Sequence, residues 1–401
     1  MRESLSGKRN RSGFTLNNTA QIILSGNTFF DTLEKLIDSA VHEIHFQTYI
    51  FEEDETGKRI ADALMRAARR EVRIFMLIDA FGSNSLTTAF INKMKAERIE
   101  IRLFGKLFKE GRFHIGRRLH RKVMVIDGVT SVVSGINISN NYNSFPGSPA
   151  WLDFSIVVQG EVSKKIRHIC NQSFLKIRFG KRSVKLREHV QEQVHRFKRH
   201  VKMRVRENDW KFGRNLVARS YYQIIRQAQE SLIIVGGYFL PGRRGKNMLR
   251  KASARGVEIK LIVAERSDVG LMRTAMLYLY DWLLRNQVRI FEYLPSNVHG
   301  KTIVADKKRI SIGSYDLNTL STYSNIELNL DVDDQELAGF LHEQLEAIIE
   351  KDCKEITKES FRTRSGIRRR FSRWLAYRLV KSLFILSIWL TKSNKKDMFQ
   401  Q

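Results

Sequence analysis

The chain has few of the residues that build disulfide frameworks, zinc sites and linkers. Its 401 residues include 2 cysteines, Cys170 and Cys353, and 4 prolines. Two cysteines so far apart predict neither a disulfide framework nor a zinc site, and we expect both to be reduced, as in a cytosolic protein. No long low-complexity linker interrupts the sequence. The length favours about two or three domains.

Long apolar runs are also missing. No uncharged apolar run reaches about 18 residues, so no ordinary membrane-spanning helix is predicted. The first residues, 1–8, lack the apolar segment of a signal peptide. The hydrophobic fraction is nevertheless 42%, which is enough for a large core.

Acidic residues are scarce relative to basic ones. Asp and Glu number 42 against 70 Lys and Arg, giving a formal net charge of +28. Such a surplus favours anionic partners: nucleic acid, acidic lipid headgroups or phosphorylated substrates. The alternative is that the charge serves only solubility, because net charge bears on association and not on fold.

The most informative feature that is present is a pair of matching octamers. Residues 120–127 read His-Arg-Lys-Val-Met-Val-Ile-Asp, and residues 299–306 read His-Gly-Lys-Thr-Ile-Val-Ala-Asp. Both fit H-x-K-x4-D, and each follows an apolar, strand-like segment. A histidine can attack phosphorus or move a proton, and a lysine can hold phosphate charge. Two copies brought face to face predict one phosphodiester-handling site that needs no metal and no other cofactor.

The spacing within each octamer assigns roles. Residues i and i+2 of a strand point to the same face, so each histidine and the lysine after it can address one phosphate. The motif aspartates fall at the strand ends, and their expected role is to fix the turn that follows. The predicted catalytic set is His120, Lys122, Asp127, His299, Lys301 and Asp306.

Small residues follow each motif and predict a phosphate-binding turn. Residues 134–137, Ser-Gly-Ile-Asn, correspond to residues 313–316, Gly-Ser-Tyr-Asp. Small residues let backbone N–H groups approach a phosphate closely, although an ordinary tight turn is the alternative. The predicted phosphate-binding residues are Asn137, Ser314 and Asn318.

A carboxylate lies downstream of each turn. These residues are Asp153 and Glu327. A carboxylate on the far ring nitrogen of a catalytic histidine sets its tautomer and stabilises its cation. We therefore predict that both orient the motif histidines.

The octamers belong to a longer internal repeat. Each half shows a helix end running into a buried strand, then a helix, a tight turn and two further strands. The matching segments are 39–49 and 228–238, 68–77 and 253–262, and 100–104 and 288–292. Strands alternating with helices predict an α/β fold of two similar lobes. The predicted divisions are an N-terminal extension (1–19), lobe 1 (20–160), a basic connector of one or two solvated helices (161–209), lobe 2 (210–350) and a basic C-terminal segment (351–401).

With these residues in place, the chain resembles the phospholipase D superfamily. The resemblance is carried by the paired motifs, the small-residue turns and the duplication. Further segments resemble bacterial cardiolipin synthases without N-terminal spanning helices, namely 49–51, 119–122, 151–153, 238–244 and 265–268. The resemblance covers roughly residues 20–350. It implies a duplicated phospholipase D-like α/β fold with the active site between the lobes.

The resemblance also implies a two-step mechanism. His120, by family habit, attacks phosphorus and forms a phosphohistidine, while His299 protonates the leaving alcohol and then deprotonates the acceptor. Lys122, Lys301 and Asn137 would hold the non-bridging oxygens. The implied donor is phosphatidylglycerol, and the acceptor is a second phosphatidylglycerol or another lipid with a free hydroxyl. The implied product is cardiolipin.

The sequence departs from the family pattern at Asp316, where an asparagine is usual. A carboxylate there repels phosphate unless it is protonated or turned away. We expect Asn318, two residues on, to replace it. In the first repeat, Glu71 stands where glycine is expected and lacks glycine's tolerance of positive φ.

The C-terminal segment predicts a membrane partner. Residues 361–381 carry many arginines and no acid, and apolar residues recur at every fourth position. The apolar stripe is Ile367, Phe371, Leu375, Leu379 and Leu383. This pattern suits a helix lying in a membrane interface, with Trp374 and Trp389 at headgroup depth; a helix packed on the lobes is the alternative. We expect peripheral attachment to anionic phospholipid, on the cytoplasmic face of the inner membrane, without an obligate protein partner.

The sequence is compatible with three functions. The first is a membrane-surface phosphatidyltransferase. The second is a phospholipase D-type hydrolase, or a phosphodiesterase or nuclease of the same superfamily, which the +28 charge permits. The third is a non-catalytic lipid-binding scaffold. The C-terminal stripe and residues 238–244 favour lipid over nucleic acid, and intact His and Lys in both halves argue against a scaffold.

Overall fold

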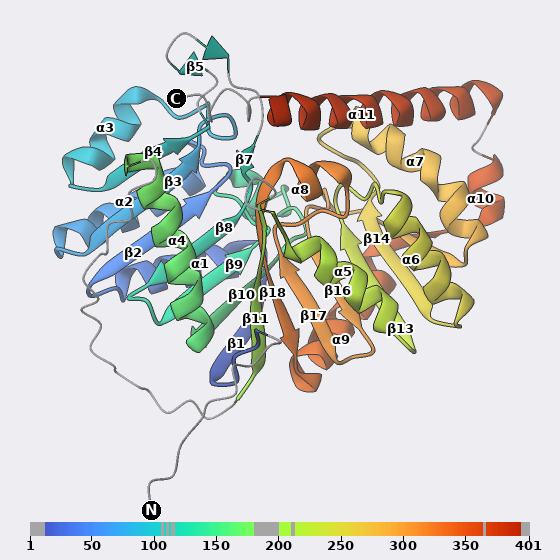
Figure 1. Ribbon diagram of the computed structural model, residues 1–401, viewed down its shortest axis with the longest axis horizontal. Coiled ribbons are helices and arrows are strands. Elements are labelled where there is room, and N and C mark those ends of the chain that lie inside the picture. The colour runs from blue at the N-terminus through green and yellow to red at the C-terminus, as the bar shows by residue number, and fades with distance from the viewer. Residues whose placement is uncertain are drawn as a thin grey trace, which may run out of the picture.

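A computed structural model describes most of the chain. The described residues are 13–105, 108–109, 112–113, 117–179, 200–209, 213–363 and 366–393. Most of the predicted N-terminal extension and residues 180–199 of the predicted connector therefore lie outside the described residues. Two mixed β-sheets stand side by side, each with helices on its faces (Figure 1).

The first lobe is a seven-stranded sheet with the order β1-β10-β9-β8-β2-β3-β4. Its parallel strands are joined by helices, as βαβ connections require. Its strands are β1 (Asn18–Leu24), β2 (Glu43–Thr48), β3 (Arg73–Asp79), β4 (Glu100–Phe104), β8 (Lys122–Ile126), β9 (Thr130–Ser134) and β10 (Phe154–Gly160). Its helices are α1 (Asn27–Asp38), α2 (Glu55–Arg69), α3 (Thr88–Ala96) and α4 (Glu161–Phe179).

The second lobe repeats this order, with β11-β18-β17-β16-β13-β14-β15 at the heart of its sheet. These strands are β11 (Lys202–Asp209), β13 (Ser231–Gly236), β14 (Glu258–Ala264), β15 (Val288–Tyr293), β16 (Lys301–Ala305), β17 (Arg309–Gly313) and β18 (Asn325–Asp333). The helices are α5 (Leu216–Gln227), α6 (Arg243–Ala254), α7 (Gly270–Arg285), α8 (Thr319–Tyr323), α9 (Gln335–Asp352), α10 (Lys358–Thr363) and α11 (Ile367–Ser393). The edge strands are β12 (Arg214–Asn215) and β19 (Cys353–Ile356). The duplicated α/β fold is confirmed.

The connector, predicted as one or two solvated helices, is a helix in its first described part and a strand in its second, and both parts pack on the lobes. Residues 161–179 form α4, which packs on lobe 1 through Val162, Ile166, Cys170 and Phe174, all buried. Residues 202–209 form strand β11, which pairs with β18 and holds the place that β1 holds in lobe 1. Each lobe therefore extends into the segment expected to be a solvated linker.

The hydrophobic core has three large parts. One lies under α1, α2 and α3 in lobe 1, and another lies under α5, α6, α7 and α11 in lobe 2. The third contains residues of both lobes, including Val123, Phe154, Val235 and Leu328. This shared core is one buried apolar cluster that spans the interface between the lobes, and it fixes the two motifs relative to each other.

The two repeats end their second helices in the same left-handed turn. Gly256 has φ 88 after α6, and Glu71 has φ 68 after α2. The prediction that this turn needs positive φ is confirmed. Glu71 carries a conformational cost there of roughly 1 kcal/mol that glycine avoids.

Candidate active site

The two H-x-K motifs lie at the junction of the lobes. Each histidine immediately precedes the central strand of its sheet, since β8 begins at Lys122 and β16 begins at Lys301. The short strand β7 (Arg118–Leu119) leaves its own lobe and pairs in parallel with β18 of lobe 2. In return, Leu152 of lobe 1 forms a parallel bridge with Val298 of lobe 2. The motif segments are therefore exchanged across the interface.

Each histidine is held by a carboxylate from the opposite lobe. His120 Nδ1 lies 3.0 Å from both carboxylate oxygens of Glu327. His299 Nδ1 lies 2.7 Å from Oδ2 of Asp153. A neutral imidazole that donates its Nδ1–H keeps its lone pair on Nε2, so both rings present a nucleophilic or basic nitrogen to the same space.

The backbone repeats this crossed arrangement. His120 N donates to the carbonyl of Ile326, the residue before Glu327, at 3.0 Å. His299 N donates to the carbonyl of Leu152, the residue before Asp153, at 2.9 Å. Each histidine is thus fixed at its backbone and at its ring by the same two-residue segment of the other lobe.

The lysines stand beside the histidines. Lys122 Nζ donates to the carbonyl of His120 at 2.7 Å, and Lys301 Nζ donates to the carbonyl of His299. Both are buried, and burial together with the charge of Lys301 lowers the pKa of Lys122 to about 7. Two buried cations this close together favour the binding of an anion between them.

The two histidine–carboxylate pairs differ in their proton affinity. Burial lowers the pKa of both His120 and His299, and so favours the neutral form of each ring. Burial would also raise the pKa of Glu327, but the charges of His120 and Lys122 outweigh it and lower that pKa. Burial raises the pKa of Asp153 to about 7. Near neutral pH, the His299 pair can therefore take up or release a proton, while Glu327 stays ionised beside His120.

Comparison with known proteins places this geometry in a family. The sequence pattern described as "Cardiolipin synthase, PLD-like domain" matches residues 33–148 and again residues 221–349, one match in each lobe. The chain belongs to the phospholipase D superfamily. Among curated proteins, it is 31% identical to cardiolipin synthase B of Salmonella typhimurium over 348 residues, which cover 86% of this chain and 84% of the relative. It is 32% identical to cardiolipin synthase B of Shigella flexneri over 347 residues, 84% of this chain and 82% of the relative.

Solved structures agree on the fold. A crystal structure of phosphatidylserine synthase from Haemophilus influenzae superposes with a TM-score of 0.67 and 16% identity, covering 90% of this chain and 94% of that one. The chain is thus a cardiolipin synthase-like enzyme of the phospholipase D superfamily. Among the described residues, no helix is long and apolar enough to cross a membrane. In the same part of the chain, no three His, Cys, Asp or Glu side chains are grouped so that they could hold a metal ion.

The predicted phosphate ligands of this superfamily member are engaged within the protein. Asn137 accepts from Ile50 N at 3.1 Å and donates to the Tyr142 hydroxyl at 2.7 Å. Ser314 donates to Glu327 at 2.6 Å, so it braces the carboxylate that holds His120. Asn318 caps α8 by accepting from Ser321 N. Their phosphate contacts stay predictions, and in this structure their described bonds organise the walls of the site.

The motif aspartates lie at the far ends of the central strands, and their predicted role needs correction. Neither fixes only its own turn. The Asp127 carboxylate accepts from the backbone N of residues 41, 42 and 43 at 2.7–3.0 Å, and Asp306 accepts from residues 229, 230 and 231 at 2.9–3.1 Å. Each ties the end of the motif strand to the start of the neighbouring strand, β2 or β13.

We therefore expect Asp306→Ala to cost stability and not catalysis. It removes charge-assisted bonds to three backbone donors and places alanine at φ 52, so the free energy of unfolding should fall by about 2–3 kcal/mol. Urea unfolding measures the loss, and kcat under folding conditions should stay near wild type. Lys308→Ala, an exposed substitution in the same turn, is the control. A kcat lost together with an unchanged urea midpoint would return Asp306 to the catalytic set.

Aromatic rings surround both histidines, and most of them were not predicted as site residues. The His120 ring packs edge-on against Tyr49, with centroids 5.0 Å apart. The His299 ring packs against Tyr142, Trp151 and Tyr238 at 5.1–6.4 Å. The tyrosines at 49 and 238 follow the equivalent strands β2 and β13, so the repeat itself contained their signal. These rings limit water around the reacting nitrogens and hold the imidazoles in place.

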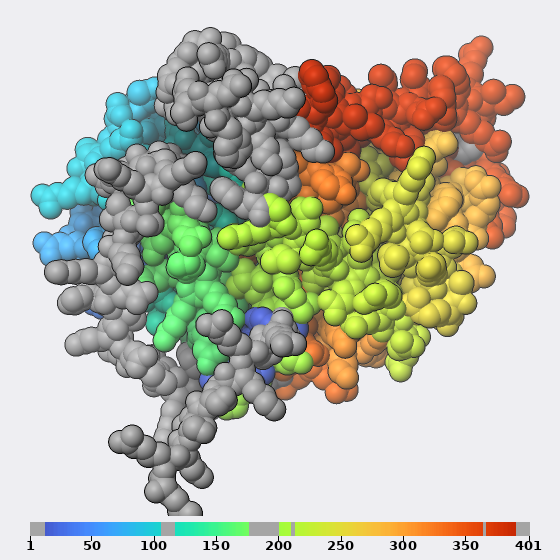
Figure 2. Space-filling view, in the orientation of Figure 1, coloured from blue at the N-terminus to red at the C-terminus, as the bar shows by residue number. Residues whose placement is uncertain are grey.

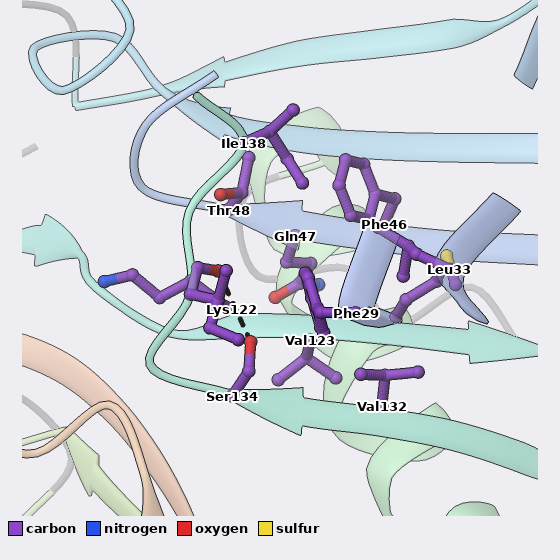
Figure 3. Close-up of a pocket in the computed structure, with 12 residues that line it drawn as sticks. Phe29, Leu33, Phe46, Gln47, Thr48, Lys122, Val123, Val132, Ser134 and Ile138 are labelled. Carbon is purple, nitrogen blue, oxygen red and sulfur yellow. Dashed lines mark hydrogen bonds between the residues drawn. The ribbon is translucent and has the colours of Figure 1, made fainter. Parts of the chain in front are cut away.

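A small apolar cavity lies behind Lys122 in lobe 1. It is lined by Phe29, Phe46, Val123, Ile138 and neighbouring side chains. Figure 3 shows that the Lys122 amine points away from these apolar side chains. The cavity therefore borders the charged centre only through the Lys122 side chain, and most of its lining belongs to the packing of the sheet against α1.

Proposed function

We propose that the chain is a phosphatidyltransferase that makes cardiolipin from phosphatidylglycerol and a second phospholipid with a free hydroxyl. The observation that carries this proposal is the crossed pair of buried histidine–carboxylate dyads with two lysines between them. That arrangement provides two nitrogens and two cations for one phosphodiester. The naming of the curated relatives as cardiolipin synthases supports lipid as the substrate.

The chemistry proceeds in two displacements at phosphorus. His120 Nε2 attacks the phosphorus of the donor, and the bond to the headgroup oxygen breaks. The proton held by the His299–Asp153 pair passes from His299 Nε2 to the oxygen of the departing glycerol. In the second step the acceptor hydroxyl gives its proton to His299 and attacks the phosphohistidine. His120 leaves, and cardiolipin forms. Lys122 and Lys301 offset the charge that develops on the non-bridging oxygens in both steps.

The unequal dyads support this division of roles. An ionised Glu327 stabilises the cationic ring of a phosphohistidine on His120. The Asp153 carboxyl, with its pKa raised to about 7, lets the His299 dyad hold and release a proton near neutral pH. The first step needs that proton, so turnover should fall as the pH rises above about 7.

Lipid analysis tests the transferase proposal. The purified protein is incubated with vesicles of phosphatidylglycerol, and the products are measured by mass spectrometry. Cardiolipin with one glycerol released per cardiolipin is the expected result. Phosphatidic acid without cardiolipin would replace the proposal with the hydrolase, and unchanged lipid would overturn it.

We further propose that α11 attaches the enzyme to the membrane surface from one edge of lobe 2. Figure 2 shows this helix along one margin of the molecule. Ala376 and Val380 are buried against lobe 2, and Tyr377 stacks on Tyr278 of α7 with centroids 4.8 Å apart. One face of α11 therefore packs on the protein, as the alternative from the sequence predicted, and contact of the exposed face with lipid is our proposal.

The outer face of α11 is apolar and basic. Its exposed apolar side chains include Phe371 at 60%, Leu379 at 48% and Trp389 at 61%. The exposed basic residues are Arg368, Arg369, Arg370, Arg378 and Lys381. Further exposed apolar side chains lie at the start of α7, namely Val269 and Leu271, and on α8, namely Tyr323, and both helices contact α11. Since α8 contacts α11 and begins three residues after Asp316, the membrane surface would lie beside the active site.

Vesicle binding tests this surface. Deleting residues 361–401 would expose the face of α7 that α11 covers. Substitutions on the exposed face of α11 therefore test membrane binding more specifically than the deletion does. The triple variant Phe371→Asp, Leu379→Asp and Leu386→Asp should raise the dissociation constant for phosphatidylglycerol vesicles at least about tenfold. Sedimentation with vesicles measures it. A matched control places three aspartates at exposed apolar positions elsewhere, namely Leu16, Val41 and Phe340. Equal binding by the two triple variants would contradict the assignment of α11.

A further inference from the structure

Asp316 is a third carboxyl group at the centre of the active site. It lies in the loop between β17 and α8, and its Oδ2 is 3.9 Å from Lys301 Nζ. Its Oδ1 is buried, and among the described residues no donor lies within hydrogen-bonding distance of it. The side chain is 4% exposed, similar to Lys122 at 3% and His299 at 5%, so it is as accessible as the groups that must contact substrate. It is not turned away from the site.

The equivalent position in lobe 1 is occupied by an amide. Asn137 follows β9 as Asp316 follows β17, and both of its polar atoms have partners within lobe 1. An unpaired buried polar atom is costly, so the Oδ1 of Asp316, which has no partner among the described residues, points to a bound ligand as its partner. The only difference between asparagine and a protonated aspartate in shape is one group, NH2 against OH, and both can donate.

Asn318, the expected replacement for Asp316, makes its hydrogen bonds within lobe 2. Its Oδ1 accepts from Ser321 N at 2.8 Å, and its Nδ2 donates to the carbonyl of Tyr238 at 3.3 Å. These bonds tie α8 to the end of β13. Both polar atoms of Asn318 are thus engaged within lobe 2, and its predicted phosphate contact stays a prediction.

The balance of charged groups in the site decides whether Asp316 must be protonated when a phosphodiester binds. Asp153 and Glu327 are committed to the histidines, and the cations are Lys122 and Lys301. An ionised Asp316 would already leave the carboxylates in excess of the lysines before an anion entered. We propose that Asp316 contacts the substrate phosphodiester as a neutral carboxylic acid, donating a hydrogen bond to a non-bridging oxygen, so that the anion and one proton bind together. This rests on the proposed function in requiring a phosphodiester site.

The proton balance is simple. The carboxylate takes one proton from solvent, the O–H bond forms, and the proton remains on Asp316 while it donates to the phosphate oxygen; no covalent bond of the substrate changes. Burial raises the pKa of Asp316, opposed by the charges of Lys301 and His120. The other titratable groups within its electrostatic reach are Glu327, Lys122, Asp153, Tyr221 and Tyr238.

The test compares the pH dependence of anion binding in two proteins that differ by this proton. Dimethyl phosphate, a phosphodiester monoanion, is titrated into the full chain from about pH 6 to about pH 9 and followed by phosphorus NMR line broadening. Lys122 titrates in both proteins, so the difference between wild type and Asp316→Asn isolates Asp316. Above the pKa of Asp316, the wild-type dissociation constant should rise about tenfold per pH unit relative to Asp316→Asn, and the two should converge at low pH.

Controls keep the result specific. Asp316→Ser is a second variant that cannot take up the proton, for use if the asparagine variant does not fold. Asp333→Asn removes a carboxylate of the same lobe that faces Lys202 at the surface, and it should keep the wild-type profile. Parallel profiles for wild type and Asp316→Asn, weaker binding by Asp316→Asn at every pH, or no binding by either would overturn the proposal. Proton-linked binding without cardiolipin formation would contradict the transferase assignment alone.

Discussion

The rate of phosphatidyl transfer by purified His120→Ala and by purified His299→Ala is expected to fall about 10,000-fold or more. When several residues act as one catalytic unit, loss of any one of them removes most of the catalysis. His120 supplies the nitrogen that bonds to phosphorus, and His299 moves the proton in both steps. Their rings lie against carboxylates of opposite lobes, so neither histidine can substitute for the other without losing its own partner. Cardiolipin formation from phosphatidylglycerol vesicles measures both.

Folding must be separated from chemistry in these variants. His120→Ala leaves the buried Glu327 carboxylate without its ring partner, which destabilises the protein by about 1–3 kcal/mol. His120→Gln and His299→Gln retain a polar side chain and should be equally inactive. His168→Ala, an exposed histidine on α4, is the matched control and should keep full activity. Full activity in a folded alanine variant would remove that histidine from the mechanism.

Glu327→Gln is expected to lower kcat between about 100-fold and about 10,000-fold. The amide keeps a hydrogen bond to His120 Nδ1 but cannot stabilise the cationic phosphohistidine, and it permits the wrong tautomer. Rapid-quench kinetics should show the loss in the first step, the formation of the enzyme adduct. Asp333→Asn on the same strand, β18, should leave the rate unchanged.

Asp153→Asn is expected to slow proton transfer by His299 more than it slows formation of the phosphohistidine on His120. It removes the carboxyl whose pKa lies at about 7, so the fall in turnover above pH 7 should disappear from the pH profile as the rate drops. Identical pH profiles for the two dyad variants would mean that the histidines are not unequal in the way proposed.

The duplicated fold was predictable because it depends on local patterns. Alternating strands and helices occur twice in the same order, and each H-x-K strand follows the same preceding strands. In the segment before lobe 2, the burial of α4 and the strand β11 were missed, because the many charged residues favoured solvated helices. Val201, Met203 and Val205 alternate with polar residues, which is the period of a strand, and α4 carries a buried stripe at every fourth position. Both signals were present in the sequence.

The crossing of the site depends on tertiary structure. The sequence identified Asp153 and Glu327 as partners for histidine, but Asp153 lies 146 residues from His299 and Glu327 lies 207 from His120. Only the exchange of β7 and Leu152 between the lobes decides which carboxylate meets which ring. The same holds for Asp127 and Asp306. The backbone N–H groups that donate to their carboxylates, at the starts of β2 and β13, cannot be found from spacing alone.

The measurement that tests the central claim most directly is the identification of the covalent intermediate. Enzyme mixed with phosphatidylglycerol vesicles is quenched in alkali within the first turnover, digested and analysed by peptide mass spectrometry. A phosphatidyl group on His120, absent from His120→Gln and lost on addition of acceptor lipid, is the predicted result. An adduct on His299, or cardiolipin formed with no adduct on either histidine, would contradict it.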